Sequence, residues 1–289
     1  MLNSLGYRTD LVFRDGPNPY GIVRKLWPEK RVLPKIFIIG AQKSGTTTLY
    51  ALLRQHPFLI RPKFKEPFFF GNDDRFQRGL TSYLPNFPTV RQMRIAESKT
   101  KHTCMSIDAT TNYLDHEKAA ERIKTLVPDA KIIVLLRNPI VRAHSHYKMA
   151  VRNGLEQLNF AEALEKEDER IRQGANSIHN YCTQRLGYRT RGEYARLLPP
   201  WLKTFDQKKL LILCAEDFFL NTEISYNTVL NFLDLPSQEG IAFTPYNISP
   251  DKKIPDEKSM RFLASYFEPW NKKLEMLLNR KFPWNANEK

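Results

Sequence analysis

The chain has 289 residues, 42% of them hydrophobic and 26% charged, so it is long enough and apolar enough to bury a core. These proportions exclude a disordered chain, and 12 glycines and 19 prolines in no repeat exclude a collagen-like fibre. The 45 lysines and arginines against 31 aspartates and glutamates give a net charge of +14. This surplus favours an anionic partner such as nucleic acid, an anionic membrane, a nucleotide or an acidic substrate, but a merely basic surface is an open alternative.

An irregular arm over residues 1–34 precedes the first predicted strand. That strand, residues 35–39, is a short β-rich run that ends at Gly40. A helix is predicted over residues 47–55, and an ordered loop rich in proline, lysine and phenylalanine over residues 58–71.

Two further strands are predicted, over residues 131–136 and 210–214, because each is a short apolar run. Helices are expected over residues 117–126, 141–152, 160–173, 193–205 (interrupted at Pro199-Pro200), 225–233 and 259–278 (bent at Pro269). Strands that alternate with helices predict an α/β fold, in which a central parallel sheet is flanked by helices on both faces. We expect one domain over residues 35–289, with its ligand at the carboxyl ends of the strands.

A glycine-containing loop, Gly-Ala-Gln-Lys-Ser-Gly-Thr-Thr-Thr, follows the first strand over residues 40–48. Its glycines let backbone N–H groups turn inward, and the start of the next helix adds partial positive charge. The sequence therefore predicts an anion site in this loop. The residues expected to contact the anion are Lys43, Ser44, Gly45, Thr46, Thr47 and Thr48.

The loop departs from the Walker pattern of nucleotide triphosphatases. Thr46 stands where a Walker loop has its lysine, and the lysine lies earlier, at Lys43, which favours a shorter 5′ chain than a triphosphate. Such enzymes also place an aspartate after a strand to hold Mg²⁺, whereas here the apolar run 131–136 ends in Arg137. A cation at that place favours a second phosphate and no metal.

Arg137 and Ser145 form a second candidate anion site. Arg137 follows a predicted strand, and Ser145 lies eight residues further on, in the next helix. An arginine fork with a hydroxyl is suited to one phosphate monoester. The alternative is an arginine paired with a loop carboxylate.

Together, these two segments resemble the two signatures of sulfotransferases that use 3′-phosphoadenosine 5′-phosphosulfate (PAPS). The matching residues are 42–47 (Gln-Lys-Ser-Gly-Thr-Thr) and 134–139 (Val-Leu-Leu-Arg-Asn-Pro) with Arg142 and Ser145. The resemblance runs from about residue 33 to the C-terminus and implies a P-loop-like three-layer fold. It implies that the first segment holds the 5′-phosphosulfate and the second holds the 3′-phosphate, with PAP as the desulfated product.

A third segment, residues 65–70 (Lys-Glu-Pro-Phe-Phe-Phe), resembles the loop with the catalytic glutamate in the heparan-sulfate-type branch of that family. The resemblance implies that Glu66 takes the proton of the acceptor and that Lys43 meets the charge on the departing oxygen. It also suggests a loop before the last helix, in which Lys252 or Lys253 contacts the 3′-phosphate; a solvated charge pair is the alternative. The rival bases are the histidines, His56, His102, His116, His144, His146 and His179.

The chain departs from the related glycan enzymes at residues 108–113, Asp-Ala-Thr-Thr-Asn-Tyr, where they commonly have Glu-Lys-Thr-Pro. The lysine of that motif is missing, so the resemblance assigns no cation there. Neither the membrane anchor nor the late disulfide of those enzymes is visible, and no apolar run approaches the roughly 18 residues of a membrane span. Three scattered cysteines, Cys104, Cys182 and Cys214, are typical of a reducing compartment. We therefore expect a cytoplasmic enzyme with a small-metabolite acceptor rather than a glycan, sulfated on a hydroxyl or an amine.

Two other functions are compatible with parts of the sequence. A kinase-like enzyme that uses ATP would explain the glycine loop, but not the displaced lysine or Arg137. A nucleic-acid-binding module would explain the net charge, but the sequence has no recognisable reader motif. We therefore expect no nucleic-acid partner.

Overall fold

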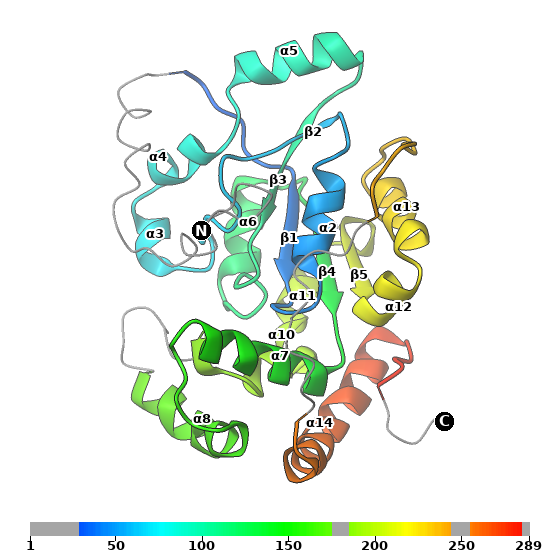
Figure 1. Cartoon of the computed structure of the whole chain (residues 1–289). Helices are drawn as coiled ribbons and strands as arrows, with labels where there is room; N and C mark the ends of the chain where they lie inside the picture. Colours follow the sequence, from blue (N-terminus) through cyan, green and yellow to red (C-terminus); the bar gives the residue numbers. More distant parts are fainter. Residues whose placement is uncertain (1–28, 175–184, 244–254, 285–289) are drawn as a thin grey trace.

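The computed structural model describes residues 29–174, 185–243 and 255–284. Within these ranges, five parallel strands form one sheet in the order β2-β3-β1-β4-β5. The strands are β1 (Ile36–Gly40), β2 (Leu59–Ile60), β3 (Met105–Ala109), β4 (Lys131–Leu136) and β5 (Leu210–Cys214). Helices lie on both faces of this sheet, so the predicted α/β fold class is confirmed (Figure 1).

Alternate residues of the central strands pack against two separate hydrophobic clusters. Ile132 and Val134 of β4 face one cluster, and Ile133 faces the other, all without solvent exposure. The first cluster includes residues of α6 (Ala119–Leu126), α10 (Tyr194–Leu197) and α11 (Pro199–Thr204). The second includes residues of α2 (Thr46–Leu53), α12 (Ala215–Leu220) and α13 (Thr222–Phe232). Burial on both faces explains why β4 is an uninterrupted apolar run.

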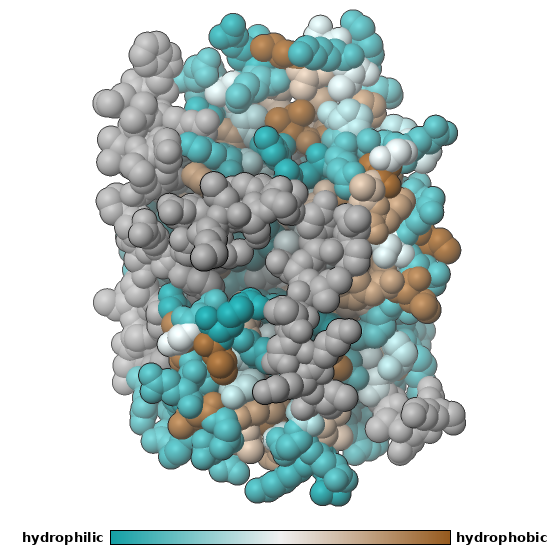
Figure 2. Space-filling view, in the orientation of Figure 1, coloured by the Kyte–Doolittle hydropathy of each residue, from teal (hydrophilic) through white to brown (hydrophobic). Residues whose placement is uncertain are grey.

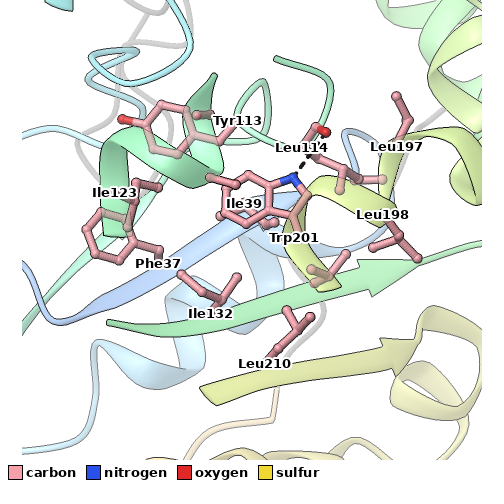
Figure 3. Packing of buried hydrophobic residues seen from close by; sticks show 14 of the residues in the cluster. Phe37, Ile39, Tyr113, Leu114, Ile123, Ile132, Leu197, Leu198, Trp201 and Leu210 are labelled. Carbon is pink, nitrogen blue, oxygen red and sulfur yellow. Dashed lines mark hydrogen bonds between the residues drawn. The ribbon is translucent and has the colours of Figure 1, made fainter. Parts of the chain in front are cut away.

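Trp201 of α11 is the largest fully buried side chain among the described residues and belongs to the first cluster. Figure 3 shows its indole ring over the sheet, close to Ile39 and Ile132, and its indole N–H donates to the main-chain oxygen of Leu114 at 3.4 Å. Because Leu114 lies in the loop after β3, this contact ties that loop to the covering helices. Burial of a ring of this size contributes several kcal/mol, of the order of the ~3–5 kcal/mol measured for large-to-small core substitutions.

A third cluster joins α7 (Pro139–Arg152), α8 (Phe160–Gly174) and α14 (Glu257–Leu278). In Figure 1, the arrowheads of β1 and β4 point toward α7, so this group of helices lies beyond the carboxyl edge of the sheet. The side chain of Asn138 accepts hydrogen bonds from the N–H groups of Ile140 and Val141 and caps α7. The loops after β1 and β4 are thereby held between the sheet and α7.

Most predicted elements are present, with small shifts at their ends. The strands 131–136 and 210–214 have the predicted bounds, and the helix predicted over 193–205 is divided at Pro199, as expected. The helix predicted over 259–278 begins at Glu257 and continues through Pro269. The described part also contains α3 (Asp73–Gln77), α4 (Leu80–Tyr83), α5 (Val90–Thr100) and the 3₁₀ helices η2 (Leu84–Asn86), η3 (Thr190–Gly192) and η4 (Gln207–Lys209).

The sequence did not reveal β2 and β3. β2 has two residues and lies inside the predicted loop 58–71. β3 contains Ser106 and Asp108, which are fully buried although they are polar, so the strand has no continuous apolar run. Of the predicted N-terminal arm, residues 1–28 lie outside the described part, and Arg31 forms a single antiparallel bridge with Thr89.

The described surface is mixed in character. Figure 2 shows mostly hydrophilic side chains, with a small apolar group at the edge where α12 and α13 lie in Figure 1. The exposed apolar residues of these two helices are Phe219, Leu220 and Ile224. Among the residues that the structure describes, no helix has the length and hydrophobicity needed to cross a lipid bilayer.

Candidate active site

The loop between β1 and α2 needs its two glycines. Gly45 has a φ of +93°, and a Cβ there would lie 2.7 Å from Cζ of Phe219. A Cβ on Gly40 would lie 2.8 Å from Cβ of Leu114. Gly45 is also the N-cap of α2, and no side chain of the described residues caps this end. The sequence prediction of a glycine loop that presents a helix N-terminus is therefore correct in geometry.

The polar side chains of this loop differ in how deeply they are buried. Ser44, Thr46 and Thr48 are buried, and Thr47 is half-buried. The hydroxyl of Thr47 accepts a hydrogen bond from Nζ of Lys65 at 3.3 Å. Thr47 is therefore the loop hydroxyl that joins this segment to the segment containing Glu66.

Arg137 lies directly against the glycine loop. Its Nη1 donates to the main-chain oxygen of Lys43 at 2.9 Å. Its own main-chain oxygen accepts from the hydroxyl of Tyr194 at 2.9 Å, which fixes the end of β4. The carboxylate of Glu216 acts on Arg137 electrostatically and accepts a hydrogen bond from the N–H of the next residue, Asn138, at 2.9 Å. Burial lowers the pKa of Arg137 from its usual value.

Lys43 of the loop is close enough to four other cationic side chains for their charges to act on it. The pKa of Lys43 is lowered to about 8, first by burial and then by the positive charges of Arg152, Arg137, Lys65 and Lys148. Like charges close together disfavour one another, so this cluster is stabilised when an anion binds among them. The structure therefore brings the cations of three separate segments to one place beyond the carboxyl edge of the sheet.

Ser145 lies on α7 and is half-buried. Lys148 and Arg152 follow it by three and seven residues, so the three side chains share one face of the helix. Two of them act electrostatically on Lys43. This places the predicted hydroxyl on the face of α7 that carries the cationic cluster.

Glu66 lies in a tightly fixed loop. Its Oε1 accepts hydrogen bonds from Nζ of Lys65 at 3.0 Å and from Oγ1 of Thr111 at 3.2 Å. Both Glu66 and Phe68 have positive φ values, +59° and +55°, a conformation that non-glycine residues seldom adopt without support. That support includes Arg75, whose Nη1 donates to the main-chain oxygen of Pro67 at 2.8 Å.

A buried carboxyl group supports the loop that contains Glu66. The side chain of Asp108 accepts hydrogen bonds from the hydroxyls of Tyr83, Tyr113 and Thr110, at 2.6, 2.9 and 2.5 Å. The hydroxyl of Tyr113 in turn accepts from the N–H of Phe69 at 3.2 Å. Burial, which outweighs these hydrogen bonds, raises the pKa of Asp108 to about 6. The sequence did not reveal this network, although a polar residue inside a β-rich run was a signal for it.

Arg191 is a second residue that sequence reasoning missed. It is buried, its Nη1 donates to Oε1 of Gln42 at 2.7 Å, and its Nη2 pairs with Asp115 at 3.0 Å. It therefore links the glycine loop to the segment after β3. These residues are far apart in the sequence, so only the tertiary structure reveals the link.

The remaining predicted residues are less closely tied to the site. His146 is fully buried, and burial and then Arg142 lower its pKa well below the usual value. His56 lies 3.1 Å from the main-chain oxygen of Pro236, His102 stacks on Phe58, and His116 lies 3.5 Å from Asp73. Residues outside the described part are Lys252, Lys253, His179 and Cys182.

A model of the sulfotransferase domain matches residues 33–249. The chain belongs to the sulfotransferase domain family. The resemblance to sulfotransferases is thereby confirmed, and so is the expectation of an enzyme of the sulfotransferase class. This is the family in which PAPS is the sulfuryl donor.

Individual relatives agree with this membership. This sulfotransferase domain is 28% identical over 289 residues to the mouse bifunctional heparan sulfate N-deacetylase/N-sulfotransferase 4, with 89% of the chain and 31% of that protein covered. It is 25% identical to mouse carbohydrate sulfotransferase 15, of which it covers 55%. The chain thus spans about a third to a half of the length of these relatives.

A solved structure of similar size is that of a sulfotransferase from Alicyclobacillus acidocaldarius. It has a TM-score of 0.66 and 29% sequence identity, with 87% of this chain and 98% of that chain covered. This likeness confirms the P-loop-like sulfotransferase fold. In the described part of this domain, no group of three or more His, Cys, Asp or Glu side chains is placed to hold a metal ion.

Proposed function

We propose that this enzyme transfers the sulfuryl group of PAPS to a hydroxyl or an amine, with Glu66 as the general base. The observation that carries the proposal is the bond from Arg137 to the carbonyl of Lys43, which joins the two phosphate-binding segments inside one cationic cluster. A nucleotide with a phosphosulfate at one end and a phosphate at the other matches that distribution of charge.

The 5′-phosphosulfate is held by the loop between β1 and α2. Its ligands are the backbone amides at the start of α2, the hydroxyls of Ser44, Thr46, Thr47 and Thr48, and the ammonium group of Lys43. The 3′-phosphate is held by Arg137 and Ser145, with Lys148 and Arg152 on the same side of α7. Lys252 and Lys253 are proposed as further ligands of this phosphate.

The transfer needs one proton acceptor and one cation. Glu66 accepts the proton of the acceptor nucleophile, whose oxygen or nitrogen forms a new bond to sulfur. The bond from sulfur to the bridging oxygen breaks in line with this attack, and its electron pair stays on the 5′-phosphate of PAP. The protonated side chain of Lys43 stabilises the charge that develops on that oxygen.

These roles require no metal ion, because Arg137 stands at the end of β4 where a metal-dependent nucleotide enzyme has a carboxylate. We propose a cytoplasmic location, since Cys104 and Cys214 are buried free thiols. The acceptor is a small molecule or a glycan. Its identity is tested by incubation with labelled PAPS and a panel of alcohols, phenols, amines and glycans; transfer to none of them, with PAP release at the background rate, would contradict the proposed activity.

A further inference from the structure

Lys65 occupies the space between the two halves of the proposed site. Its Nζ lies 3.3 Å from Oγ1 of Thr47 and 3.0 Å from Oε1 of Glu66, and its side chain is 18% exposed. Thr47 is the second residue of α2, whose N-terminus faces the proposed phosphosulfate site. Glu66 is the proposed base. One ammonium group therefore touches both the donor side and the acceptor side.

The position of Lys65 matters because sulfuryl transfer is in line. The sulfur must lie between the departing phosphate oxygen, near Lys43 and Thr47, and the nucleophile, near Glu66. The charge of Lys65 is also one of those that lower the pKa of Lys43 to about 8, so the two ammonium groups are close enough to interact. The three oxygens of a sulfuryl group in this space would be within reach of the Lys65 side chain.

The chain has no cation at the position where the related glycan enzymes have the lysine of their Glu-Lys-Thr-Pro motif. That place is taken by Ala109, which is buried at the end of β3 and carries no charge. Lys65 reaches Glu66 from the loop that precedes Phe69 and Phe70. It thus restores a positive charge beside the proposed base without any residue from residues 108–113.

We propose that Lys65 is a catalytic residue that moves from Glu66 to the sulfuryl oxygens when PAPS binds. This inference rests on the proposed function and adds a residue to it. The ammonium group stays protonated throughout and forms no covalent bond. Its departure leaves Oε1 of Glu66 with a lone pair for the proton of the acceptor, while its charge stabilises the sulfuryl group in the transition state.

A purely structural ion pair would behave differently. A structural pair would only hold Lys65 against Glu66, whose side chains are 18% and 13% exposed. Its loss would not distinguish PAPS from PAP, because the two nucleotides differ only in the sulfuryl group. A lysine that binds the sulfuryl oxygens affects PAPS more than PAP.

The test compares the dissociation constants of PAPS and PAP by calorimetry, without acceptor, for the wild type and for Lys65→Met and Lys65→Arg. Lys63→Met is the matched control, because Lys63 lies two residues away and is exposed. We expect Lys65→Met to weaken PAPS binding about 10-fold more than PAP binding, in line with the loss of a charge-assisted hydrogen bond. Lys65→Arg should recover part of this difference, and Lys63→Met should change both constants by the same small factor.

Unchanged PAP binding by Lys65→Met shows that the variant is folded and that the nucleotide site is intact. Equal weakening of PAPS and PAP would overturn the role of Lys65 and leave the proposed function standing. If the arginine variant is as defective toward PAPS as the methionine variant while PAP binding is intact, the positive charge is not what matters and the inference is also overturned. Failure of the wild-type protein to bind PAP would instead contradict the proposed function.

Discussion

The guanidinium of Arg137 donates a hydrogen bond to the carbonyl oxygen of Lys43 at 2.9 Å, across 94 residues of sequence. This bond links the loop after β1 to the end of β4. Because it uses one N–H group of the guanidinium fork, other donors of the same side chain are left for a ligand. The two segments that resemble the sulfotransferase signatures are thus in contact before any nucleotide binds.

Replacement of Arg137 by alanine tests the assignment of the 3′-phosphate. Loss of a charge-assisted contact costs about 1.5–3 kcal/mol, so we expect the dissociation constant of PAP to rise about 10- to 150-fold. Adenosine 5′-phosphosulfate lacks the 3′-phosphate and should be affected far less, although the bond to Lys43 is lost for both ligands. Competition calorimetry with the two nucleotides gives the comparison. An equal loss for both would mean that Arg137 does not bind the 3′-phosphate.

The affinity for PAP should fall above about pH 8. Lys43 has a pKa of about 8 in the free protein because burial and four cations oppose its charge, and a bound anion raises that pKa. Below pH 8 the ammonium group is present before binding; above it, binding must take up a proton, and the affinity falls by up to about tenfold per pH unit. Titrations between pH 7 and 9.5 measure this. In Lys43→Ala, the affinity for PAP should be lower at pH 7, and its decline above pH 8 should be largely abolished. If the affinity of this variant falls as steeply as that of the wild type, a group other than Lys43 causes the pH dependence.

Tyr113 should support catalysis through the loop that contains Glu66. Tyr113→Phe removes the hydroxyl that donates to Asp108 and accepts from the N–H of Phe69, and so leaves a buried amide unpaired. We expect a loss of about 1–3 kcal/mol in the free energy of unfolding, together with a fall in kcat at unchanged PAP affinity. Tyr83→Phe is the control, because Tyr83 donates to Asp108 and makes no hydrogen bond to Phe69. If both variants lower kcat equally, the network does not act through this loop.

Glu66→Gln should separate chemistry from binding. The amide keeps the size of the side chain and an acceptor oxygen for Thr111, but it cannot take a proton at neutral pH. Turnover should fall by about 10²–10⁴-fold, while the melting temperature and the PAP affinity change little. The measurement is single-turnover transfer of labelled sulfate to the acceptor found in the panel. If the variant retains more than about a tenth of the wild-type rate, another residue is the general base, and the histidines are the next residues to replace.

The sequence predicts the parts of this protein that depend on local patterns. β4 and β5 are continuous apolar runs because helices cover both faces of the sheet, and the glycine loop is visible because Gly45 must have a positive φ. The sequence did not reveal β3 because a polar residue, Asp108, is buried in it. Hydrogen bonds donated by the hydroxyls of Tyr83 and Thr110 offset the free-energy cost of burying this carboxyl group.

The contacts that organise the site depend on the tertiary structure rather than on local sequence patterns. The contact of Lys65 with Thr47 and that of Arg191 with Gln42 join residues 18 and 149 positions apart. Lysine and arginine on a basic chain are usually surface residues, so neither position stood out among the 45 basic residues. The lowered pKa of Lys43 likewise follows from which charges the fold brings together, and no spacing in the sequence encodes it.

The central claim is that the cationic cluster beyond the carboxyl edge of the sheet binds the nucleotide of a sulfuryl donor. Calorimetric titration with PAP in the presence of EDTA tests it most directly, with Mg·ATP titrated separately in EDTA-free buffer. We predict that PAP binds with a stoichiometry of about one and that Mg·ATP binds far more weakly, because Arg137 replaces the metal-binding carboxylate of ATP-dependent enzymes. Absence of PAP binding together with tight binding of Mg·ATP would contradict the account.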